Sequence, residues 1–145
     1  MRILVGYDGS ESSGRALDRA IAEAREHHAH ITVISVEKMP LDPEAPRNFG
    51  TLGDISASEG APFAPPPGVA KHLQEANAQL DAAGLTGDLT WAAGEPGAEI
   101  VEAAKRSRAT VIVVGEHHHG FLGSLFGGNV DEEVKREAGC DVILA

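Results

Sequence analysis

The chain has 145 residues, of which 42% are hydrophobic and 23% are charged, and it carries a formal net charge of -10 at neutral pH. A chain of this length is expected to form one domain around one core, and its composition argues against a disordered or fibrous protein. Aromatic residues make up only 4% of the chain, and the acidic balance would repel a phosphate backbone. The sequence therefore predicts no binding to DNA or RNA.

Cysteine usage and the apolar segments indicate the compartment. The single cysteine, Cys140, has no second cysteine in the chain with which to form a disulfide, which favours the reducing cytoplasm. The apolar run at residues 3–6 is too short for a signal peptide. No segment approaches the ~18 apolar residues that a membrane span requires. The sequence predicts a soluble cytoplasmic protein without a membrane partner.

The first third of the chain alternates between strand and helix patterns. Residues 3–5 are an apolar run that ends at glycine and small polar residues, as expected of a buried strand entering a turn. Alanine, leucine and isoleucine then recur at helical spacing from residue 16 to residue 24, and the serines within residues 10–13 offer capping oxygens. Residues 31–36 are rich in β-branched side chains and predict the second strand.

Residues 38–68 differ in kind from the rest of the chain. Seven of the eight prolines and several glycines lie in this segment, which predicts a long irregular excursion. Its composition favours a solvated linker. The alternative is a lid, because the segment follows the second strand and so leaves the sheet on the side where ligands bind in such folds.

The regular pattern resumes after the excursion. Residues 69–83 carry a helical apolar stripe that Gly84 is expected to end as a C-terminal cap. Residues 89–93 predict the third strand, and Pro96 opens the next helix at a position where its missing N–H does no harm. Residues 110–114 are almost entirely β-branched, which indicates a strand buried on both faces.

The last segment contains a loop, a helix and a strand. Residues 115–128 hold five glycines and three histidines. Asn129 is expected to begin a helix, and residues 142–144 predict the final strand. Five strands that alternate with four helices imply right-handed crossovers. We therefore expect residues 1–145 to form one α/β domain, a doubly wound five-stranded parallel sheet with helices on both faces.

The predicted strands place three loops at one rim of the sheet. In open parallel sheets, ligands bind beyond the carboxyl ends of the strands. The loop that follows residues 110–114 sets backbone N–H groups just before a helix N-terminus, which is suited to holding a phosphate. Asp8, after the first strand, is placed to accept a hydrogen bond from a ribose hydroxyl or to hold a metal ion. A purely local role in the turn is the alternative.

Three stretches of this sequence resemble the universal stress proteins. They are the turn at residues 7–10, the helix opening at residues 94–96 and the passage from residue 113 to residue 130. Nucleotide-binding members of that family carry a glycine, two residues, a second glycine, nine residues, and a glycine followed by serine or threonine. Gly115 matches the first glycine and Gly128 the last. The resemblance implies an adenine nucleotide alpha-hydrolase-like fold, a stress-response role, a homodimer and a bound ATP or AMP.

The chain departs from the family pattern at the phosphate side. His118 stands where the second glycine is expected, Asn129 stands where a hydroxyl residue is expected, and Asp131 adds a negative charge. No lysine or arginine occurs from residue 109 to residue 134, so Mg²⁺ or a protonated histidine such as His117 would have to balance the phosphates. By resemblance, the nucleotide-binding residues are Gly6, Tyr7, Asp8, Val36, Val114, Gly115, His117, His118, Gly128, Asn129, Val130 and Asp131.

Three functions are compatible with these residues. The first is a regulator that binds an adenine nucleotide and is read by an unidentified protein partner. The second is a dimeric interaction module of the same fold that does not bind nucleotide, and the third is a weak ATPase or self-phosphorylating protein. No catalytic residue is predicted, and the adjacent histidines at 117–119 do not predict a metal site, because three or four ligands must converge on one ion. A homodimer is expected through residues 140–145, at a sheet edge.

Overall fold

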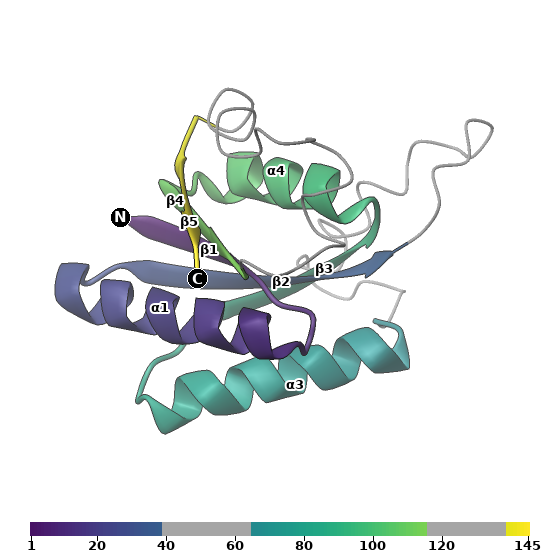
Figure 1. Ribbon diagram of the computed structural model, residues 1–145, viewed down its shortest axis with the longest axis horizontal. Coiled ribbons are helices and arrows are strands. Elements are labelled where there is room, and N and C mark those ends of the chain that lie inside the picture. Colours follow the sequence, from purple (N-terminus) through teal and green to yellow (C-terminus); the bar gives the residue numbers. More distant parts are fainter. Residues whose placement is uncertain (39–64, 116–138) are drawn as a thin grey trace.

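The computed structural model describes residues 1–38, 65–115 and 139–145. In chain order the elements are β1 (Arg2–Gly6), α1 (Glu11–His27), β2 (His30–Lys38), α3 (Pro67–Ala82), β3 (Asp88–Gly94), α4 (Pro96–Ser107), β4 (Val111–Val114) and β5 (Asp141–Leu144). The strands form one sheet in the order β3-β2-β1-β4-β5, and every pairing is parallel (Figure 1). The predicted doubly wound five-stranded sheet is confirmed.

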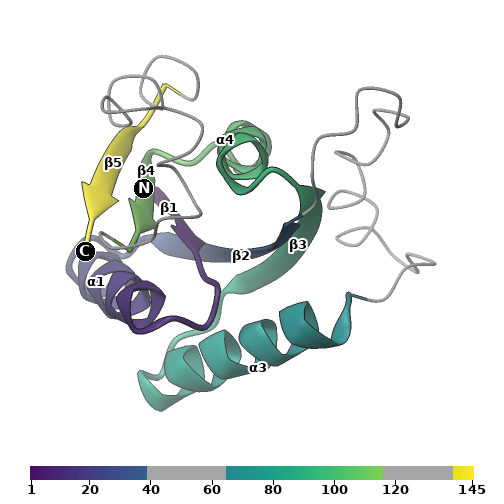
Figure 2. The same ribbon diagram turned by 45° about the vertical axis from the view of Figure 1, so that its right-hand side comes forward.

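Helices cover both faces of the sheet. α1 and α3 lie side by side on one face, whereas α4 lies on the other (Figure 2). Side chains along β1 alternate between these faces, as the pleat of a strand requires. Val5 packs with Leu17 of α1 and Leu80 of α3, while Leu4 packs on the opposite side with residues of α4. The sheet is therefore buried on both faces, as the β-branched run of β4 predicted.

The ends of the predicted excursion belong to regular elements, which corrects the boundaries drawn from composition. β2 continues to Lys38, and α3 begins at Pro67, so Gly68 is also helical. Pro67 is tolerated because the first residue of a helix makes no use of its N–H inside the helix, and its fixed φ suits helical backbone. The rest of the excursion, residues 39–64, and the predicted helix that begins at Asn129 lie outside the described residues.

The glycine cap predicted for the helical segment at residues 69–83 is present at the end of α3. Gly84 has a φ of +74°, and its N–H donates to the carbonyl of Asp81 at 2.9 Å. The next N–H, that of Leu85, donates to the carbonyl of Leu80 at 3.0 Å. These two bonds form a Schellman motif, which needs a residue in the left-handed region and so favours glycine. The cap turns the chain from α3 towards β3.

None of the helices in residues 1–38, 65–115 and 139–145 is long and apolar enough to span a membrane.

Cys140, just before β5, has an exposed fraction of 5%. Burial raises the pKa of its thiol, and the nearby Asp141 carboxylate raises it further. Because the thiolate is the reactive form, we expect Cys140 to react with a disulfide reagent at pH 8 roughly tenfold or more slowly in the folded protein than in urea. Absorbance of the released thiol chromophore measures both rates. Equal rates in the two states would contradict the burial of this side chain.

Candidate functional site

The strand order creates one topological switch point, between β1 and β4. From β1 the chain moves outward to β2 and β3, and it then returns to β4 on the other side of β1. The register pairs Val5 with Val113. Gly6 and Val114 are therefore level with each other at the carboxyl ends of the two strands, and Gly115 follows. Ligands of open α/β sheets bind at such points.

The turn at residues 8–10, here called the Asp8 turn, is tied to the start of α1. Oδ1 of Asp8 accepts hydrogen bonds from the N–H and the hydroxyl of Ser10, at 3.0 and 2.6 Å. Ser10 is also the N-cap of α1, because its hydroxyl oxygen accepts from the N–H of Ser13 at 3.1 Å. The backbone N–H of Asp8 in turn donates to the Ser13 hydroxyl at 3.3 Å. The local turn role that the sequence offered for Asp8 is therefore real, and it places the carboxyl group at the switch point.

Gly115 lies against the first turn of α1. A Cβ built on Gly115 would be 2.5 Å from Oγ, 2.7 Å from Cβ and 2.8 Å from the carbonyl carbon of Ser12. Ser12 is itself buried and its hydroxyl is 3.2 Å from that of Ser10. Only glycine lets the end of β4 approach α1 this closely. The end of β4 and the first turn of α1 are therefore packed directly on each other at the switch point.

The structure brings some of the predicted nucleotide-binding residues together and separates others. Gly6, Asp8, Val114 and Gly115 gather at the switch point, whereas the side chains of Tyr7 and Val36 lie on opposite faces of the sheet. Tyr7 belongs to the cluster beneath α1 and α3, and Val36 is half-buried against the cluster on the α4 side. The other predicted residues, His117, His118, Gly128, Asn129, Val130 and Asp131, lie outside the described residues.

Two residues near the Asp8 turn were not predicted from the sequence. They are His72 and Glu75 of α3, whose side chains reach Gly9 and the hydroxyl of Tyr7. Tyr7 has an exposed fraction of 6%, and burial raises the pKa of its phenol, with further contributions from the carboxylates of Glu75 and Asp8. A signal was available in the sequence, because polar residues three positions apart share a face of a helix.

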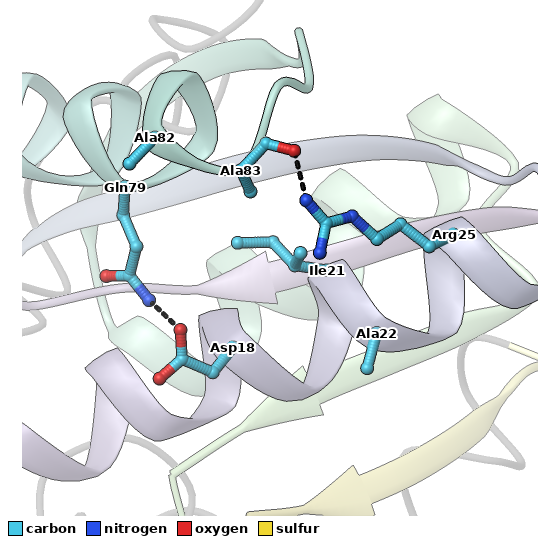
Figure 3. A pocket seen from close by; sticks show the side chains of 7 residues that line it. All are labelled: Asp18, Ile21, Ala22, Arg25, Gln79, Ala82 and Ala83. Atoms are coloured by element: carbon cyan, nitrogen blue, oxygen red, sulfur yellow. Dashed lines mark hydrogen bonds between the residues drawn. The ribbon is translucent and has the colours of Figure 1, made fainter.

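A groove of about 420 Å³ runs between α1 and α3, away from the switch point (Figure 3). It is lined by Asp18, Ile21, Ala22, Arg25, Gln79, Ala82 and Ala83. Gln79 donates to Oδ1 of Asp18 at 2.7 Å, and Arg25 donates to the carbonyl oxygen of Ala83. These bonds join the two helices along an open surface. We therefore assign the groove to helix packing and place the candidate site at the switch point.

Two carboxylates and one histidine lie close together on the solvent side of α1. Glu23, Glu26 and His27 have ligand atoms within 4.8 Å of one another, and Glu26 and His27 are exposed. Glu23 is already paired with Arg19 at 2.9 Å. Exposed acidic groups at helical spacing commonly occur without an ion, so we assign no metal to this cluster.

Comparison with known proteins identifies relatives of the whole chain. The sequence profile of the Universal stress protein family matches residues 1–145. A universal stress protein of Thermus aquaticus, encoded in the 3' region of a QAH/OAS sulfhydrylase, is 32% identical over 147 residues, which cover 98% of this chain and 96% of that protein.

Solved structures of the same family have the same fold. The crystal structure of a universal stress protein in complex with cAMP is 29% identical, with a TM-score of 0.67 over 100% of this chain and 96% of that chain. The universal stress protein of Archaeoglobus fulgidus in complex with dAMP is 24% identical, with a TM-score of 0.61 over 99% of this chain and 96% of that one, and supports the fold alone. The profile match over residues 1–145, on a five-stranded parallel sheet with its switch point between β1 and β4, shows that this chain belongs to the universal stress protein family.

Proposed function

We propose that this protein binds an adenine mononucleotide at the switch point between β1 and β4, and that it acts as a stress-response regulator rather than as an enzyme. The observation that carries the proposal is the close packing of Gly115 on Ser12, next to the Asp8 turn, where the strand order reverses, which is where ligands of such sheets bind. The cAMP complex of a relative with 29% identity supports adenine as the base.

The proposed contacts follow from the chemistry of the ligand. Asp8 would accept a hydrogen bond from a ribose hydroxyl, and Gly115 would let the backbone approach the ligand closely. The segment from His117 to Asp131 would supply the phosphate contacts. AMP is the preferred ligand, because the chain offers no lysine or arginine from residue 109 to residue 134 to balance a triphosphate. ATP would then depend on Mg²⁺.

We also propose that the protein is a homodimer joined through β5. This strand is at one edge of the sheet, and Leu144 has an exposed fraction of 44%. An edge strand presents N–H and C=O groups that pair readily with a second strand. Two copies of β5 related by a two-fold axis would pair antiparallel and would bury both Leu144 side chains.

The Asp8→Asn protein tests the role of the carboxylate. The asparagine carbonyl can still accept the bonds from Ser10, so the turn and the melting temperature are expected to be preserved. AMP affinity is expected to fall about tenfold, because a charge-assisted hydrogen bond is roughly twice as strong as a neutral one. Calorimetric titration measures the affinity, and Asp81→Asn, an exposed change on α3, is the control with unchanged binding. An Asp8→Asn protein that binds AMP as tightly as wild type would remove Asp8 from the site.

The same experiments separate the other two functions. Absence of binding by every adenine nucleotide in the wild-type protein would favour the interaction module. Steady release of inorganic phosphate from ATP, abolished by Asp8→Asn, would favour the ATPase.

A further inference from the structure

Three polar side chains of α3 reach across to the segment from β1 to α1. His72, Glu75 and Gln79 are spaced so that they share one side of the helix. They contact Gly9, the hydroxyl of Tyr7 and the carbonyl of Gly14 respectively. We call these three residues the α3 stripe. Its contacts extend from residues 7–9 to Gly14, so α3 lies along the Asp8 turn and the first turns of α1.

Two residues of the α3 stripe, His72 and Glu75, lie next to the Asp8 turn. Two atoms of the His72 ring, Cδ2 and Nε2, are 2.7 and 2.8 Å from the position that a Cβ on Gly9 would occupy, and Oε2 of Glu75 is 3.5 Å from it. Gly9 has a φ of +82°, which L side chains rarely adopt. The backbone conformation and the proximity of α3 therefore both require glycine at this position, and α3 limits the space on that side of the turn.

Glu75 also links the turn to the buried ring of Tyr7. The hydroxyl of Tyr7 donates to Oε2 of Glu75 at 3.4 Å, a long bond between groups 68 residues apart. Tyr7 directly precedes Asp8, and its N–H donates to the carbonyl of Ile34 at 2.9 Å. The residue before the turn is thus held at its backbone by β2 and at its side chain by α3.

The third residue of the α3 stripe, Gln79, joins α3 to α1 by hydrogen bonds. Nε2 of Gln79 donates to the carbonyl of Gly14 at 3.0 Å and to Oδ1 of Asp18 at 2.7 Å. This two-point contact sets how α3 lies along α1, and so where His72 and Glu75 sit over the turn. The Asp8 turn is thus hydrogen-bonded to Ser13 of α1 through the N–H of Asp8 and the hydroxyl of Ser10. His72 and Glu75 of α3 approach it at Gly9.

We propose that Glu75 and His72 are positioning residues, which hold the Asp8 turn in the conformation that receives the nucleotide. The inference rests on the proposed function for its ligand, but the restraint on the turn exists without ligand. Neither side chain has to touch the nucleotide. Loss of either would loosen the turn and weaken binding while leaving the core beneath α3 intact.

The chain provides a direct optical readout of the contact, because Tyr7 is its only tyrosine. Alkaline titration of tyrosine absorbance therefore follows this one phenol. Glu75→Gln keeps the shape of the side chain and removes its charge, so the phenolate is less disfavoured and the pKa of Tyr7 is expected to fall towards its ordinary value. Asn77→Ala, an exposed change on the same helix, is expected to leave the titration unchanged.

Two further measurements on the intact protein complete the test. Without nucleotide, amide hydrogen exchange at residues 8–10 is expected to be faster in Glu75→Ala, which removes the acceptor for the Tyr7 hydroxyl, and in His72→Ala than in wild type or Asn77→Ala. AMP affinity is expected to fall about two- to tenfold in Glu75→Ala, the range that loss of one ordinary hydrogen bond gives, and to fall also in His72→Ala, which removes the contact with Gly9.

The outcomes distinguish this inference from the proposed function. Unchanged exchange at residues 8–10 in both variants would overturn the positioning role, as would faster exchange with AMP affinity equal to that of wild type. If wild-type protein binds no adenine nucleotide, the proposed function fails. Exchange alone then decides whether the α3 stripe restrains the turn.

Discussion

The Gly115→Ala protein is expected to lose about 1–3 kcal/mol of unfolding free energy, the usual range for overpacking a close contact. The added methyl group would lie 2.5–2.8 Å from three atoms of Ser12, one of which is a backbone atom. No side-chain rotation of Ser12 can relieve all three contacts. The end of β4 must therefore move away from α1, which would also open the switch point and weaken nucleotide binding.

Gly14→Ala is the matched control for this substitution. Gly14 lies inside α1, and nothing is within 4 Å of the position that its Cβ would take. Alanine there is expected to stabilise the protein by about 0.5–1 kcal/mol, because glycine is unfavourable inside a helix. Urea unfolding of the two variants should give opposite signs. A Gly115→Ala protein as stable as wild type would show that β4 and α1 are not in close contact.

Leu144→Asp is expected to convert the proposed homodimer to monomers at micromolar concentration. In an antiparallel pair of β5 strands, each new carboxylate would be buried in the interface without a positive partner, which costs several kcal/mol. A cost of that size corresponds to a dissociation constant raised about a hundredfold or more. Leu144 is exposed in the single chain, so the fold itself should tolerate the change. Sedimentation velocity measures the effect.

Leu89→Asp distinguishes the two edges of the sheet. Leu89 lies in β3, the other outer strand, and has an exposed fraction of 36%, close to the 44% of Leu144. If the dimer forms through β5, Leu89→Asp should remain dimeric. Dissociation by Leu89→Asp alone would move the interface to β3, and a wild-type protein that sediments as a monomer would remove the dimer altogether.

The fold could be predicted because its signals are local. Each described strand is a short apolar run, and caps such as Ser10 and Gly84 are set by residues within a few positions of the helix end. The end of the excursion was placed too late in the chain because a proline such as Pro67 is compatible with two different structures. Proline is typical of irregular segments, yet it is also favoured at the first position of a helix.

The site was only partly predictable because its contacts are long-range. Asp8 and Gly115 were identified from turn chemistry and family pattern, but that pattern grouped Tyr7 with Val36, whose side chains lie on opposite faces. Alternation along a strand gives the face of a residue only once the pairing of strands is known. Glu75 was missed because its partner, Tyr7, is 68 residues away. The spacing of apolar residues in α3 shows which side of the helix is buried, but it does not show what the polar side chains contact.

Calorimetric titration of the 145-residue protein with AMP is the decisive test of nucleotide binding at the switch point. We expect saturable binding of one AMP per chain with a dissociation constant below about 1 mM, equivalent to more than about 4 kcal/mol of binding free energy. Binding should weaken in Asp8→Asn and persist in Asp81→Asn. The wild-type protein is first stripped of any co-purified nucleotide. If it then gives no heat of binding with millimolar AMP, with cAMP or with ATP and Mg²⁺, the proposed nucleotide binding is contradicted.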